Sequence, residues 1–414
     1  VERLERLTAQ ERRIEVADLP PADRARVPPA PPQRDGPSRA QIDCARVLRR
    51  TDLAAPAGRD RLREAAVVPD EYHTSWRILG LYPLTSLFVS MGIARWHEEA
   101  HRTFALPLDA LPRAGRLVRY RPPPSEPLSA PEVASILRRS AANPLGIPEP
   151  TAGERAQLFD TFAPVWEVDT VDQNDRIGTP FWSPPAALIQ MDTRRPVVYR
   201  RLSRTRFAGR ILLQLNYIVW FPARPLTGTF DLYGGHLDGI NWRVTLDTDG
   251  RPLLYDAIHN CGCYHMFFPT ARLRLRTDFP SIYFEPPLVP QTLAPPAHGA
   301  RTVVRVAHHT HYLQRVIPAR VTGGGIDYAF DDYQRLRSLP LPQGGRRSMF
   351  APSGIVPGTT RAERWLLWPM GIAKPGAMRQ WGHHPVAFVG RRHFDDPNLL
   401  QQLFEPTPAK EAHP

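Results

Sequence analysis

The chain has 414 residues, of which 42% are hydrophobic and 23% are charged, so it can form a packed core and wholesale disorder is excluded. Its 47 prolines argue against an all-helical bundle, because proline interrupts helices. The formal charge of +12 favours anionic partners, but all of the basic residues except Lys374 and Lys410 are arginine. Proteins that follow phosphate backbones normally use both residue types, so nucleic-acid binding is not expected.

The first 40 residues combine a charged helical pattern with proline-rich stretches. This composition is typical of an arm or linker, so residues 1–40 are predicted to form a proline-rich arm that would bind a protein partner. Residues 41–165 follow a mainly helical pattern and are predicted to form a helical region.

The longest uncharged run covers residues 78–94, between Arg77 and Arg95. It contains Pro83, two glycines, one threonine and two serines, which makes it short and polar for a transmembrane helix. We therefore predict a buried helix here and no integral membrane span.

Residues 166–400 are rich in β-branched and aromatic runs that are separated by glycine, proline and aspartate. Asp249-Gly250 lies between two such runs and predicts a hairpin, because this pair accepts the positive φ of a tight turn. The predicted fold class is α+β, with a helical N-terminal region followed by a large antiparallel β sandwich or barrel. Residues 401–414 are predicted to form a C-terminal tail.

Two histidines and two cysteines alternate just after this hairpin. If the strand continues, all four side chains point to one side of the sheet. Imidazole and thiolate groups are ligands of zinc, copper and iron. The candidate metal ligands are His259, Cys261, Cys263 and His265.

A second alternating pair, His309 and His311, follows another strand-like run. Two such pairs on neighbouring strands would supply four ligands to one ion. The leading hypothesis is an exported, β-rich protein that binds zinc, copper or iron and acts as a redox or hydrolytic enzyme. A periplasmic or secreted location is expected from the absent initiator methionine and the low thiol count.

The motif His97-Glu98-Glu99-Ala100-His101 resembles the His-Glu-x-x-His motif of zinc peptidases. On a helix, His97 and His101 would share one face and Glu98 would activate a bound water. The chain departs from that family in its charged Glu99 and in the lack of an evident third ligand. An exposed helix end with Glu98 and Arg102 as an ion pair is the alternative.

Two further alternatives remain open. His236-Leu237-Asp238 resembles the first two ligands of the iron site of β-barrel oxygenases, although its flanking glycines favour a polar loop with Asp238 as a turn residue. A non-catalytic cell-envelope protein, with cysteines that are buried or bridged, would also explain the segment around Cys261 and Cys263. The chain has no glycine-rich nucleotide-binding motif, so ATP-dependent and dinucleotide-dependent functions are not expected.

Overall fold

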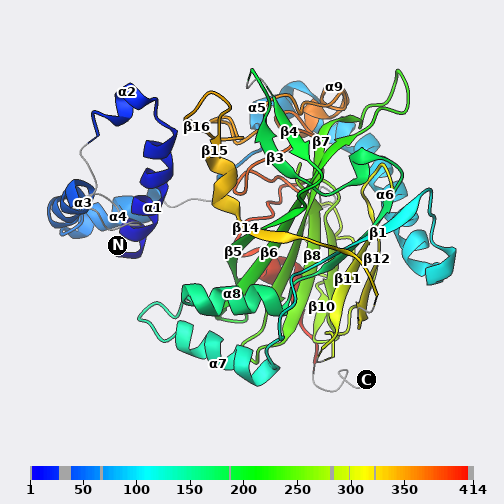
Figure 1. Cartoon of the computed structure of the whole chain (residues 1–414), viewed down its shortest axis with the longest axis horizontal. Coiled ribbons are helices and arrows are strands. Elements are labelled where there is room, and N and C mark those ends of the chain that lie inside the picture. The colour runs from blue at the N-terminus through cyan, green and yellow to red at the C-terminus, as the bar shows by residue number, and fades with distance from the viewer. Residues whose placement is uncertain are drawn as a thin grey trace. The chain divides into compact units, whose positions relative to one another are not determined.

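The computed structural model describes residues 2–27, 39–65, 69–185, 188–279, 284–297, 299–320 and 323–408 (Figure 1). The chain divides into two compact units. The smaller unit consists of residues 1–69, 181–189 and 334–351, and the larger unit consists of the rest. Ten α-helices and two large mixed sheets occur among the described residues, which confirms the predicted α+β class.

The smaller unit is mainly helical. Its helices are α1 (Glu2–Asp18), α2 (Pro21–Arg24), α3 (Arg39–Thr51) and α4 (Pro56–Ala65), and its short strands are β15 (Leu339–Pro340) and β16 (Arg346–Arg347). The helical pattern at the start of the predicted arm is confirmed by α1, which packs on α3 and β16. Residues 28–38, which contain the proline-rich part of the arm, lie outside the described residues.

The larger unit contains a six-stranded sheet in the order β14-β5-β6-β7-β8-β9. Its strands are β5 (Val197–Phe207), β6 (Arg210–Arg224), β7 (Gly235–Leu246), β8 (Pro252–His259), β9 (Met266–Pro269) and β14 (Ala329–Asp332). Only the β14–β5 pair is parallel. The predicted hairpin at Gly250 is confirmed. Gly250 has a φ of 84°, and a Cβ there would lie 2.1 Å from the Ala130 carbonyl oxygen.

A five-stranded sheet has the order β12-β11-β2-β1-β13. Its strands are β1 (Arg116–Arg121), β2 (Val165–Thr170), β11 (Arg301–Val306), β12 (Leu313–Ala319) and β13 (Ile326–Asp327). The β1–β13 and β11–β2 pairs are parallel, so this sheet is mixed, whereas a mainly antiparallel β region was predicted. These pairs join segments that are far apart in sequence, and parallel pairing requires such long connections. Within the described ranges neither sheet closes into a barrel.

Both sheets contribute buried side chains to one hydrophobic cluster. It includes Trp166 and Val304 of the five-stranded sheet and Tyr217 and Trp242 of the six-stranded sheet. Helices α7 (Ala130–Ser140) and α8 (Ala152–Thr161) add apolar side chains to the cluster. The start of α8 is defined by a capping box in which the Thr151 hydroxyl accepts from the Glu154 amide at 3.3 Å.

The uncharged run of residues 78–94 is helical, as α5 (Thr74–Leu79) and the first half of α6 (Tyr82–Ala105). The prediction that it is buried is wrong. Only Ser86, Ala100 and Phe104 of α6 are buried, because α6 packs on the core mainly through its C-terminal end. Among the helices that the structure describes, none has both the length and the hydrophobicity needed to cross a bilayer.

The remaining elements are short. They are α9 (Arg364–Leu367), α10 (Leu399–Leu403), β3 (Thr179–Trp182), β4 (Ile189–Asp192), β10 (Leu273–Leu275), β17 (Phe404–Pro406) and the 3-10 helices η1 (Leu108–Ala110), η2 (Gln173–Asp175), η3 (Tyr333–Arg337) and η4 (Trp368–Met370). Helix α10 and strand β17 extend into the predicted C-terminal tail, of which residues 409–414 are outside the described ranges.

Candidate functional site

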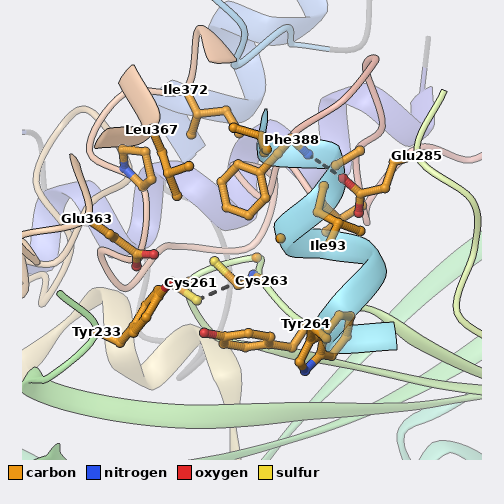
Figure 2. A pocket seen from close by; sticks show the side chains of 18 of the residues that line it. Ile93, Tyr233, Cys261, Cys263, Tyr264, Glu285, Glu363, Leu367, Ile372 and Phe388 are labelled. Atoms are coloured by element: carbon orange, nitrogen blue, oxygen red, sulfur yellow. Dashed lines mark hydrogen bonds between the residues drawn. The ribbon is translucent and has the colours of Figure 1, made fainter. Parts of the chain in front are cut away.

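A cavity of about 600 Å³ lies within the larger unit (Figure 2). Helix α6 forms one wall, the turn between β8 and β9 forms the floor, and residues 363–376 and 385–388 form the remaining walls. Figure 2 shows an apolar side and a polar side. The apolar side includes Ile93, Leu367, Ile372 and Phe388, and the polar side includes Tyr233, Cys261, Cys263, Tyr264 and Glu363. Ligand sites commonly combine these two features at this volume.

The floor is a tight turn, and the predicted continuation of the strand through residues 259–265 is wrong. Strand β8 ends at His259, whose amide donates to the Cys263 carbonyl at 3.0 Å. Gly262 has a φ of 93°, and a Cβ there would lie 2.6 Å from the Pro385 carbonyl oxygen. The residue between the two cysteines must therefore be glycine, and its conformation turns the chain back into β9.

The two thiols of this turn are free and lie close to each other. The Cys263 amide lies 3.4 Å from Cys261 Sγ. A hydrogen bond with Cys261 and burial together raise the pKa of the Cys263 thiol well above its ordinary value. Cys263 is thus protonated at neutral pH and lines the cavity as a neutral group, next to Cys261.

Arg224, at the end of β6, is the cation of the floor. Its Nη1 lies 3.3 Å from Tyr312 Oη and 3.5 Å from Tyr264 Oη, and its Nε is buried without a hydrogen-bond partner. The side chain also lies over the Tyr233 ring, 5.4 Å from its centroid. Throughout the described part of the chain, no carboxylate forms an ion pair with Arg224, although the residue is only 7% exposed. Asp238 and Glu363 act on Arg224 only from beyond ion-pair distance. A buried guanidinium with no direct ion pair is a candidate binding group for an anion.

Glu363 is one of three glutamates that line the same cavity, together with Glu99 and Glu285. Burial raises the pKa of its carboxyl from 4.5 to about 7, although Arg361 and Arg224 partly oppose this effect. Gly376 makes room for the carboxyl, because a Cβ on Gly376 would lie 1.8 Å from Glu363 Oε1. Such a group is partly ionised at neutral pH and can both accept and donate a proton.

A buried network of histidines and carboxylates supports the floor from behind. The two oxygens of Asp238 face different rings, with His259 Nδ1 at 3.3 Å and His311 Nδ1 at 2.9 Å. Burial alone would raise the pKa of Asp238, but His259, His311 and Arg361 hold it well below its ordinary value. The ionised carboxylate therefore accepts a hydrogen bond from the Nδ1–H group of each ring. The Nε2 atom of each ring then points away from Asp238.

His311 bridges two carboxylates. Its Nε2 lies 3.6 Å from Asp175 Oδ1, which is longer than a hydrogen bond, and its ring stacks on Phe221 at 4.0 Å. Burial lowers the pKa of His311, but Asp175 and Asp238 outweigh this effect and raise it. The next residue, Tyr312, is one of the two tyrosines that contact Arg224. The network thus holds the polar floor in position.

The six predicted metal ligands do not meet at one point in the structure. His259 and His311 share Asp238, whereas His265 Nε2 lies 2.9 Å from Asp256 Oδ2. His309 Nε2 lies 2.8 Å from the Pro225 carbonyl oxygen. His309 and His311 have φ values of 65° and 53°, so they form a turn after β11 and not the expected alternating strand. In the ranges that the structure covers, no group of three or more His, Cys, Asp or Glu side chains is arranged to hold a metal ion.

The predicted zinc-peptidase motif lies on α6, as expected for a helix. Glu98 pairs with Arg102 at 2.9 Å, and both side chains are exposed, which matches the alternative interpretation of an exposed helix end. Burial lowers the pKa of His97 to about 4, and no third ligand for His97 and His101 exists among the described residues.

The prediction of a polar loop around Asp238 is wrong. The segment His236-Leu237-Asp238 is not a polar loop, because it belongs to β7 and Asp238 is only 1% exposed. Arg224, Glu363 and Tyr312 were not predicted as site residues. No motif marks these residues, since they come from three distant segments that only the folded chain brings together.

Comparisons with protein-family models, with curated proteins and with solved structures found no match for this chain.

Proposed function

We propose that this protein binds an amphipathic anion and transfers a proton to or from it. Arg224 holds the carboxylate or phosphate of the ligand, assisted by Tyr264 and Tyr312. The apolar part lies between α6 and the wall that contains Leu367. Glu363 is the acid or base that moves the proton.

The single observation that carries this proposal is the buried guanidinium of Arg224 at a cavity of about 600 Å³, with no direct ion pair and with an Nε that has no hydrogen-bond partner. Isolated buried charges are unfavourable, so proteins keep them mainly where a ligand supplies the counter-ion. Arginine suits a carboxylate or phosphate because it offers several N–H donors in one plane. The pKa of Glu363, raised to about 7, adds a group that titrates in the range in which acid–base catalysts work.

The first test is a fluorescence titration with cis-parinaric acid, an apolar chain with one carboxylate, and with its methyl ester as the uncharged control. We expect saturable binding of one acid molecule per chain and binding of the ester that is at least about tenfold weaker, because the ester cannot pair with Arg224. Equal affinities for the acid and the ester, or no saturable binding of either, would contradict the proposal.

Glu363→Gln is expected to change how stability depends on pH. The pKa of Glu363 in the folded protein is above its ordinary value, so its contribution to stability is present below about pH 4.5 and is lost as pH rises through about 7. Glutamine has no such titration. The difference in free energy of unfolding between the variant and the wild type is therefore expected to depend on pH. Between pH 4.5 and pH 8 it should shift by up to ~3 kcal/mol in favour of the variant.

This change is measured by urea unfolding at a series of pH values. The control is the Glu98→Gln variant, because it also removes one carboxylate but from an exposed position on α6. Parallel pH profiles of the wild type and the Glu363→Gln variant would show that Glu363 does not titrate in the expected range.

A transition-metal centre is the second candidate function. The observation in its favour is that the Nε2 atoms of both His259 and His311 are buried and have no hydrogen-bond partner. If these histidines bind zinc, copper or iron, mass spectrometry of protein purified without chelators should find about one equivalent per chain. His311→Ala should remove the metal and His97→Ala should not. Metal far below one equivalent would exclude this candidate.

A further inference from the structure

A continuous apolar patch covers α5, the first half of α6 and the α9–η4 segment. The residues of the patch with the largest exposed fractions are Phe88 at 76%, Leu79 at 74% and Trp365 at 72%. We define the apolar patch by its exposed residues, Ile78, Leu79, Leu81, Leu84, Leu87, Phe88, Met91, Trp365, Leu366 and Trp368. Along α6 these residues follow the spacing of one helix face, which in a globular protein normally packs on the core.

The two segments of the patch form one surface because they pack directly on each other. Gly80 lies so close to η4 that a Cβ on it would be 2.4 Å from Pro369 Cβ. Arg77 Nε donates to the Met370 carbonyl at 2.8 Å. Figure 1 likewise shows α5 beside α9. Contiguous exposed apolar surface of this kind marks an interaction site.

Most of the charges around the patch are basic. The acidic side chains near it include Asp70, which pairs with Arg391, and Glu99, which lies one turn after Arg95 on α6. Residues 74–94 contain no aspartate or glutamate, and the only acidic residue of 362–376 is Glu363, which is buried. The cations are Arg77, Arg95, Arg364 and Lys374. A shallow hollow in the patch is lined by Trp76, Trp365 and Trp368 together with Arg364 and Lys374. Tryptophan and basic residues around an apolar face are typical of segments that lie at a lipid–water interface.

The patch also borders the ligand cavity. Phe88 and Leu366 belong to the patch and line the cavity as well, next to Thr85 and Leu367. An apolar ligand that enters between these side chains would pass from the surface of the patch directly into the cavity.

We propose that the apolar patch docks on the surface of a membrane that contains anionic lipids. The face is apolar, has tryptophans in its shallow hollow, and has more basic than acidic neighbours, which complements an anionic bilayer surface. A second copy of the chain would place like charges opposite each other, so it fits this face less well. The consequence for the ligand rests on the proposed function: the amphipathic anion enters the cavity from the lipid layer.

The test uses the full chain and flotation with two kinds of vesicle, phosphatidylcholine alone and phosphatidylcholine mixed with phosphatidylglycerol. The wild type is expected to float with both and to bind the anionic vesicles more strongly at low salt than at high salt. Leu84→Glu/Leu87→Glu should weaken binding to the anionic vesicles at least about tenfold, because both side chains leave water on docking. Neither side chain lines the cavity.

The matched control is Leu145→Glu/Val171→Glu, which adds the same two charges at residues that are 61% and 54% exposed and lie outside the patch. This control should bind vesicles like the wild type. Wild-type protein that does not float, equal loss in both variants, or a dimer that dissociates in the Leu84→Glu/Leu87→Glu variant without any vesicle binding would each overturn the proposal. Arg224→Met should bind vesicles normally, so failure of ligand binding is distinguishable from failure of docking.

Discussion

Asp256→Ala is expected to lower the free energy of unfolding by about 3–5 kcal/mol. Asp256 is fully buried and accepts two bonds from Arg243, from Nε at 2.9 Å and from Nη2 at 2.5 Å. Burial lowers the pKa of His265 to about 4, so this ring is neutral at pH 7, and its Nε2 lies 2.9 Å from the same carboxylate. Without Asp256, Arg243 is a buried charge with no counter-ion at 3% exposure. This loss exceeds that of an ordinary hydrogen bond because the charge cannot reach water.

Urea unfolding followed by tryptophan fluorescence measures this change, since Trp242 is the neighbour of Arg243 on β7. The double variant Arg243→Met/Asp256→Leu should recover most of the lost stability, because it removes both charges together. Arg194→Ala, which breaks a surface pair whose arginine side chain is 89% exposed, is expected to leave the free energy of unfolding nearly unchanged. A loss below about 1 kcal/mol for Asp256→Ala would show that Arg243 finds another partner.

Arg224→Met is expected to weaken the binding of cis-parinaric acid by about 2–3 kcal/mol, which is roughly 30- to 150-fold. Methionine keeps the length and apolar stem of the side chain but cannot pair with a carboxylate. Binding of the methyl ester should stay within about threefold of the wild type, since the ester makes no charged contact. Fluorescence titration of both probes on both proteins separates the charge contribution from the shape of the cavity.

The Arg224→Met variant should also fold with little loss of stability, because Arg224 forms no direct ion pair in the free protein and its Nε has no hydrogen-bond partner. This expectation distinguishes a binding residue from a structural one. A large loss of stability, or equal weakening of the acid and the ester, would show that Arg224 supports the fold and does not recognise the ligand. Arg194→Met is the control for removal of one positive charge from an exposed position.

Local sequence signals predicted several elements correctly. The Asp-Gly hairpin between β7 and β8 was predicted because that pair has a conformational preference of its own. The helix that carries His97 and His101 was predicted for a similar reason, since helical spacing is a property of neighbouring residues. The burial of α6 was predicted wrongly, because the apolar pattern of a helix does not show whether another surface covers it.

The candidate site was predicted only in part. The segment from His259 to His265 was predicted to hold metal ligands, because clustered histidines and cysteines are visible in the sequence, and in the structure residues 261–265 line a cavity. The alternation argument failed there, since it assumes an extended strand and Gly262 instead forms a turn. The same assumption failed for His309 and His311, whose positive φ values place them in another turn.

The sequence by itself determined the α+β class, several local elements and the segment in which histidines and cysteines cluster, because these follow from residue types and short spacings. The tertiary structure alone decided which groups meet. Arg224, Tyr312 and Glu363 are far apart in the chain, and their electrostatic properties depend on shared burial. Burial raises the pKa of Glu363 and leaves Nε of Arg224 without a hydrogen-bond partner, and neither effect exists before the chain folds.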